Sequence, residues 1–83
     1  MTLRDEHKQF RTLEVVPGIG KKAQEALNEF GFVTFGHLVG QFLLFSWDVE
    51  LMTAWFNEKV PGHPKHYVEA AVTSIHRWCE TNL

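Results

Sequence analysis

The chain has 83 residues and a formal net charge of −2 at pH 7, so we expect one domain spanning residues 1–83. Hydrophobic residues make up 45 % of it, which is enough for a packed core and leaves apolar surface to close between subunits. The single cysteine, Cys79, excludes an internal disulfide framework and fits the nucleus and cytoplasm. The longest strongly apolar run, Phe42–Phe45, is too short to cross a bilayer, so we expect no membrane insertion.

Apolar residues recur with the 3.6-residue period of a helix, and no run alternates as a strand does. The pattern predicts an all-α fold, a compact SAM-like bundle of five helices. The first is expected at about residues 3–12, where three basic residues form a stripe: Arg4, Lys8 and Arg11. The others are expected at Lys21 to about Phe30, after Thr34 to about Phe45, Trp47 to about Lys59, and from Pro64 onward. Thr34 and Ser46 are the expected N-caps of the third and fourth helices, and Pro64 is the expected first residue of the last.

The most informative stretch is Val16-Pro17-Gly18-Ile19-Gly20-Lys21-Lys22, which looks like a helix-hairpin-helix element. Two glycines without Cβ atoms allow a tight turn and close approach to a phosphate, while Ile19 enters the core. The first N–H groups of the following helix have no partner within it, and the helix dipole adds partial positive charge. Lys21 and Lys22 are unfavourable in a first turn, which indicates that an anion joins them. Such contacts do not read bases, so we expect sequence-independent binding to double-stranded DNA. The alternative is a glycine-rich turn that only begins an ordinary helix.

Four residues could suggest a metal or catalytic site: His63, His66, His76 and Cys79. Their spacings do not complete a zinc motif, so we expect no metal and no cofactor. His63 is expected to cap the last helix, and Cys79 lies on the apolar stripe of that helix with His76 one turn away. No catalytic arrangement stands out, so we expect no enzyme. Trp47 is the expected exposed anchor of an interface, and Gly40 the expected point of close approach by another helix.

The chain resembles the barrier-to-autointegration factor family in the order and approximate spacing of several elements. These are Gly18-Ile19-Gly20, Gly31-Phe32, Leu38-Val39-Gly40-Gln41-Phe42-Leu43, Trp55 and Arg77-Trp78-Cys79. The resemblance implies a compact helical homodimer in which each protomer presents one hairpin, so that a dimer bridges two duplexes. It also implies LEM-domain partners in a groove between protomers, and roles at chromatin or the nuclear envelope.

On these grounds the expected DNA-binding residues are Gly18, Ile19, Gly20, Lys21, Lys22, Lys8 and Lys65. The expected dimer and partner surface includes Gly40, Gln41, Trp47 and Trp55. A second hypothesis keeps the fold but not the DNA binding, because the net charge is acidic and the partner surface, which includes Phe45–Trp47, is altered relative to the family. Such a protein would act by homo- or heterodimerisation or by capturing a protein partner.

Overall fold

The computed structural model describes residues 12–83, which form one 3-10 turn and four α-helices. These are η1 (Leu13–Val15), α2 (Lys21–Glu29), α3 (Phe35–Leu44), α4 (Val49–Lys59) and α5 (Lys65–Asn82). The described part contains no strand, and its one β-type pairing is an isolated antiparallel bridge between Thr12 and Thr34. The all-α class is therefore confirmed. The five-helix count is not, because the helix predicted at residues 3–12 lies outside the described residues except for Thr12, whose backbone is extended.

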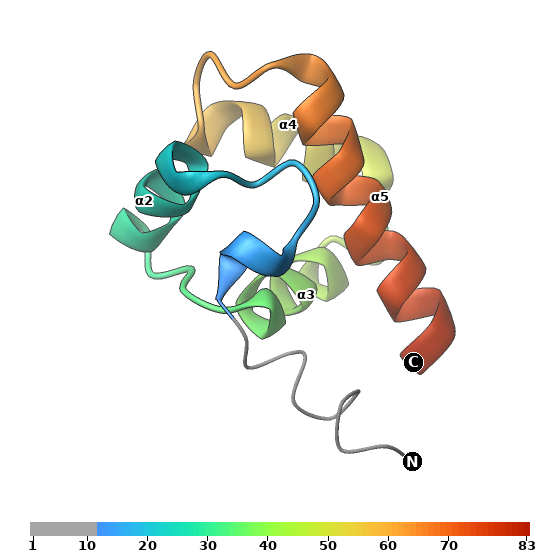
Figure 1. The fold of residues 1–83 in the computed structure, drawn as a ribbon. Helices are drawn as coiled ribbons and strands as arrows, with labels where there is room; N and C mark the ends of the chain where they lie inside the picture. The colour runs from blue at the N-terminus through green and yellow to red at the C-terminus, as the bar shows by residue number, and fades with distance from the viewer. Residues whose placement is uncertain (1–11) are drawn as a thin grey trace.

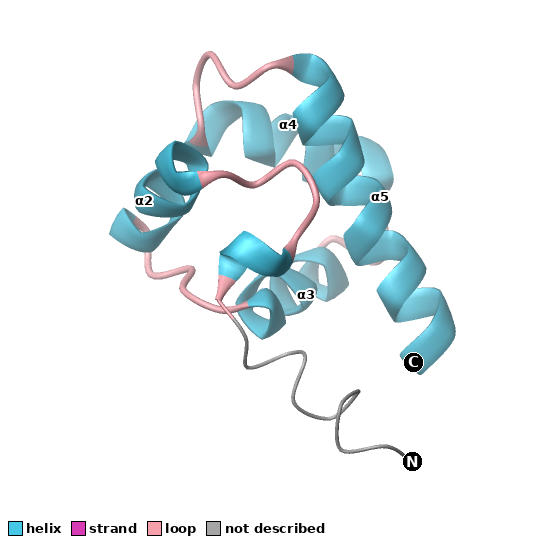
Figure 2. Cartoon of the chain, viewed as in Figure 1, coloured by secondary structure: helices cyan, strands magenta, loops and turns pink. Residues whose placement is uncertain are grey.

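The helices surround one core, and the connection from η1 to α2 crosses the face between α2, α3 and α5 (Figure 1). The longest helix, α5, contacts both α3 and α4. Loops join all the helices (Figure 2). The loop that follows α4 leads directly into the first turn of α5 (Figure 1).

The largest fully buried side chains of the core are three phenylalanines, Phe35, Phe42 and Phe56. Burial of a large aromatic or aliphatic side chain contributes about 1.5–3 kcal/mol, so each of the three contributes substantially to stability. The last helix adds the apolar stripe that its sequence predicts: Val68, Ala71, Val72, Ile75 and Cys79 are buried, and Trp78 is half-buried. No polar or charged side chain is buried among residues 12–83.

The start of α3 follows the prediction. The Thr34 hydroxyl accepts a hydrogen bond from the His37 backbone N–H at 3.3 Å, and His37 Nδ1 accepts from the Thr34 N–H at 3.2 Å. This reciprocal pair is a capping box with histidine in the position that glutamate usually takes.

The predicted N-cap of α4 is wrong, because Asp48 and not Ser46 occupies that position. Asp48 Oδ1 accepts from the Leu51 N–H at 3.0 Å. Ser46 and Trp47 instead have left-handed backbones, with φ of 55° and 65°, and they terminate α3. An N-cap needs an extended backbone, which a left-handed residue does not provide. Pro64 is likewise the N-cap of α5 and not its first helical residue.

Cys79 gives the first testable prediction, because burial raises the pKa of its thiol above the ordinary value of 9.0. The unfolded chain ionises its thiol at lower pH than the folded protein does. The thiol's contribution to stability is therefore complete below pH 9.0 and is lost as the pH rises from there through the folded-state pKa. We expect the free energy of unfolding in urea to fall more steeply above pH 9 for the wild type than for Cys79→Ala. Parallel curves for the two proteins would contradict this.

Candidate nucleic-acid interface

The hairpin between η1 and α2 is a tight turn fixed by backbone hydrogen bonds. The Val16 N–H donates to the Leu13 carbonyl at 3.0 Å, and the Ile19 N–H donates to the Val16 carbonyl at 3.1 Å. The Ile19 side chain is only 4 % exposed and joins the core, as the sequence predicts. The hairpin is therefore a rigid part of the fold with its tip held by an apolar side chain.

Gly18 is required by close packing against α5. Its φ is +87°, a backbone conformation that residues with a Cβ rarely adopt. A Cβ at this position would overlap the carbonyl oxygen of Tyr67 and come within 3.2 Å of the Ala71 nitrogen. The sequence predicts that both glycines approach a phosphate, but the contacts at Gly18 are internal to the protein.

Gly20, in contrast, faces open space. It is exposed, and a Cβ built on it meets no described atom within 4 Å. It is the N-cap of α2, where it provides no side-chain hydrogen bond, and the first bond of the helix is that from the Gln24 N–H to the Gly20 carbonyl at 3.0 Å. The N–H groups at the start of α2 are therefore left for a partner outside the described fold.

Lys21 and Lys22 occupy the first turn of α2, and both are exposed. Within the described part of the chain neither lysine takes part in an ion pair, and the first turn of α2 holds no acidic residue. Two positive charges are thus added to the partial positive charge of the helix N-terminus. This arrangement attracts an anion.

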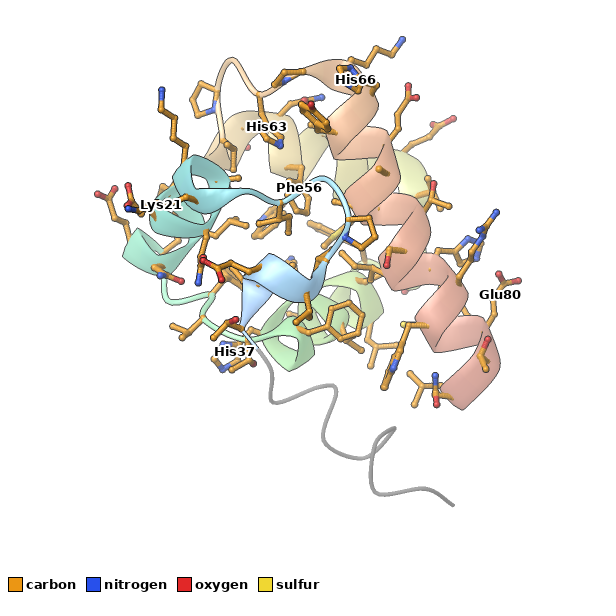
Figure 3. All side chains as sticks on the ribbon, viewed as in Figure 1. Lys21, His37, Phe56, His63, His66 and Glu80 are labelled. Carbon is orange, nitrogen blue, oxygen red and sulfur yellow. The ribbon has the colours of Figure 1, made fainter. Side chains whose placement is uncertain are left out.

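An open hollow of about 510 Å³ runs beside the hairpin. Its walls are Glu14, Val16, Pro17, Gly18, Ile19, Gly20, His63 and Tyr67. His63 Nε2 lies 2.7 Å from the Gly18 carbonyl oxygen. The prediction that His63 caps the last helix is therefore wrong, because α5 has no side-chain cap and the imidazole faces the hairpin. Figure 3 shows His63 on the α4–α5 connection, on the side toward the hairpin.

Of the two lysines that were predicted to flank the hairpin, the structure describes only Lys65. Lys65 begins α5, two residues before Tyr67, whose backbone touches Gly18, so it lies at the hairpin end of the helix. Its side chain is 90 % exposed and its Nζ is 3.9 Å from Glu69, a surface ion pair that contributes little stability. Lys8, with the rest of the basic stripe, lies outside the described residues.

A second candidate surface is apolar and lies where α3 meets α4. We use the name α3–α4 apolar surface for the large hydrophobic residues that are exposed from the end of α3 to the start of α4, which are Leu43, Leu44, Trp47, Val49 and Leu51. Leu44 is 79 % exposed, more than any other large hydrophobic residue among residues 12–83. Gly40 is exposed, no described atom lies within 4 Å of a Cβ built on it, and Gln41 is half-buried. Among residues 12–83, therefore, no other helix packs closely on Gly40.

The two predicted tryptophans do not share a cluster. Trp47 is 37 % exposed, and its ring centroid lies 6.0 Å from that of Phe42 and 6.1 Å from that of His76. Trp55 is half-buried, with its ring edge-to-face on Phe32 at 4.9 Å. Trp47 therefore lies on the α3–α4 apolar surface, while Trp55 packs against the edge of the core.

Among the described residues, neither a metal site nor a membrane-spanning helix is found. No group of three or more His, Cys, Asp or Glu side chains in residues 12–83 could hold a metal ion. None of the described helices combines the length and the apolar character that spanning a membrane requires. His76 lies 3.9 Å from Glu80, and Cys79 is buried, so the pair does not form an accessible nucleophile and base.

Comparison with known proteins agrees with the geometry of the hairpin. A sequence model of the family described as barrier to autointegration factor matches residues 5–82. The match covers nearly the whole chain, including the hairpin, the α3–α4 apolar surface and all of the described helices. The curated protein sequences gave no significant match.

Proposed function

The chain belongs to the barrier-to-autointegration factor family, a family of DNA-binding, chromatin-associated proteins, and on this premise we propose that it binds double-stranded DNA through its hairpin. The observation that carries the proposal is the start of α2. Gly20 leaves that helix end uncapped and open, and Lys21 and Lys22 add charge that the helix itself does not favour. A phosphate would accept from the free N–H groups and pair with the lysines.

The proposed binding does not depend on base sequence. Backbone N–H groups and lysines recognise phosphate oxygens, which are the same for every base pair. The net charge of −2 means that attraction comes from the local patch and not from the whole molecule. The proposed affinity is therefore modest for one hairpin, and two hairpins on one particle would raise it through multivalency.

Fluorescence anisotropy of two unrelated labelled duplexes tests this function. We expect the purified protein to bind both duplexes with the same affinity at low salt. An affinity that differs strongly between the two sequences would contradict backbone recognition. Absence of binding to either duplex at low salt would contradict the DNA-binding function as a whole.

We further infer a homodimer that bridges two duplexes, supported by the α3–α4 apolar surface. The adjacent leucines Leu43 and Leu44 are 42 % and 79 % exposed, and contiguous exposed apolar residues are typical of protein interfaces. The open space at Gly40 permits a second helix to approach the same surface. The hairpins of the two protomers would then each hold one duplex, in the nucleus or wherever DNA is accessible, and LEM-domain proteins would be partners of the dimer.

Disruption of the α3–α4 apolar surface gives a prediction for the dimer. We expect light scattering to give about twice the 9.6 kDa chain mass for the wild type, and the chain mass for Leu44→Glu/Leu51→Glu. The dimer of this variant is unstable because each protomer would bury two glutamate charges in the interface without partners. Val33→Glu is the control, because Val33 is 46 % exposed on the α2–α3 connection and is not a member of this surface. A wild-type monomer, or a double variant that stays dimeric, would contradict the assignment.

The second candidate function is a protein-interaction module that has lost DNA binding. It is favoured by the acidic net charge together with the exposed Leu44 and Trp47. In that case the protein would form homo- or heterodimers, and no duplex would bind even at low salt. The anisotropy measurement distinguishes the two functions directly.

A further inference from the structure

We propose that His63 is a positioning residue for the hairpin and that it sets the direction of the N–H groups that meet DNA. The observation is the 2.7 Å contact between His63 Nε2 and the Gly18 carbonyl oxygen, which joins residues 45 positions apart in the chain. A carbonyl oxygen only accepts hydrogen bonds, so Nε2 must carry the hydrogen. The imidazole is therefore held in one tautomer, with Nδ1 free of that hydrogen when the ring is neutral.

This contact completes the restraint of one peptide unit. The Gly18 carbonyl and the Ile19 N–H belong to the same planar amide. His63 holds the carbonyl, and the Val16 carbonyl accepts from the Ile19 N–H at 3.1 Å. Both polar ends of the amide are thus fixed, so it cannot rotate about the chain without losing a hydrogen bond.

The next peptide unit along the chain ends at Gly20, which is exposed and whose N–H has no hydrogen-bond partner among the described residues. It carries the Gly20 N–H, directly before the free N–H groups of α2. The buried Ile19 side chain fixes the residue between the two units. A restrained Gly18–Ile19 amide therefore fixes the direction of the Gly20 N–H and of the start of α2 before any ligand arrives.

Tyr67 supports the imidazole from the first turn of α5. The centroids of the His63 and Tyr67 rings are 5.7 Å apart, and the Tyr67 backbone lies against Gly18. The same turn of α5 therefore holds the hairpin directly and holds the histidine that fastens it. Preorganisation of this kind raises affinity because less freedom is lost on binding.

The experiment compares three full-length variants with the wild type, and it rests on the proposed DNA binding. His63→Ala removes the donor, and His63→Gln returns an N–H donor at nearly the same reach. Thr34→Ala is the stability control, because it removes the α3 cap without touching the hairpin. We expect duplex affinity to fall about tenfold in His63→Ala, which corresponds to one lost hydrogen bond, and to stay within about twofold in His63→Gln and Thr34→Ala.

Two results would overturn the inference while leaving DNA binding in place. One is a His63→Ala variant that binds as well as the wild type. The other is a His63→Gln variant as weak as His63→Ala, because the imidazole would then contact DNA itself and not act through the hairpin.

If the wild type binds no duplex, the proposed function fails, and amide hydrogen exchange decides the role of His63. We expect exchange at the Ile19 N–H to become about tenfold faster in His63→Ala, with core amides unchanged, and to return to the wild-type rate in His63→Gln. Uniform acceleration across the protein would show a general loss of stability and would overturn the positioning role.

Discussion

Replacing Gly18 with alanine is expected to lower the free energy of unfolding by about 3–5 kcal/mol, a large part of what so small a domain has. Two costs add. An alanine at φ +87° is strained, and its Cβ would overlap the Tyr67 carbonyl oxygen, which is backbone and cannot rotate away. Denaturation in urea, followed by circular dichroism, measures the loss.

Gly20→Ala is the matched control, because the two glycines lie two residues apart in one turn and differ in their surroundings. Nothing lies within 4 Å of a Cβ at Gly20, and its backbone is extended, so the variant should unfold within about 1 kcal/mol of the wild type. Its duplex affinity should nevertheless fall, because the methyl group enters the space proposed for phosphate. Equal stability of the two variants would show that the hairpin does not rest on α5 as described.

The double variant Lys21→Gln/Lys22→Gln is expected to lose duplex affinity on the order of a hundredfold at 50 mM salt. Each phosphate contact contributes a counterion-release factor of about tenfold at that salt concentration, and its loss makes the slope of log K against log salt shallower by about 0.9. The free protein should not be destabilised, because a cation in the first turn of a helix is unfavourable by about 0.3–1 kcal/mol. A weaker binder with an equal or higher melting temperature is therefore the expected result.

Lys59→Gln provides the control for that charge change. Lys59 ends α4, where its Nζ lies 4.5 Å from the centroid of the Phe30 ring and 3.9 Å from Glu58. The variant removes one positive charge beside Phe30, at the opposite end of α2 from the hairpin lysines, so it should change duplex affinity less than twofold. If Lys59→Gln weakened binding as much as each hairpin lysine does, attraction would be a property of the whole surface and not of the hairpin.

Local features of the sequence predicted much of the fold. The stripe that includes Val68, Val72 and Ile75 repeats at helical spacing, and burial of that stripe in α5 follows directly. The cap at Thr34 was also predictable, because it depends on residues within one turn. The start of α4 was not, because Ser46 and Asp48 are both good N-caps. The choice between them depends on the left-handed turn that places Trp47 against Phe42 and His76.

Some residues of the candidate site could likewise be predicted from their neighbours in the sequence, and others could not. Ile19, Lys21 and Lys22 lie on the hairpin and the first turn of α2, where local reasoning placed them. The internal role of Gly18 and the contact of His63 depend on α5 and on the α4–α5 connection, which are far away in the sequence. No local pattern marks a histidine 45 residues away as the partner of a hairpin carbonyl.

The central claim is that the hairpin holds DNA by its phosphates, and the salt dependence of duplex binding by the wild type tests it most directly. Anisotropy titrations across a series of salt concentrations should give a linear fall of log K with log salt, steeper than that of Lys21→Gln/Lys22→Gln by about 1.8 for two lost contacts. An affinity that does not change with salt, or a slope that is the same in both proteins, would contradict the claim.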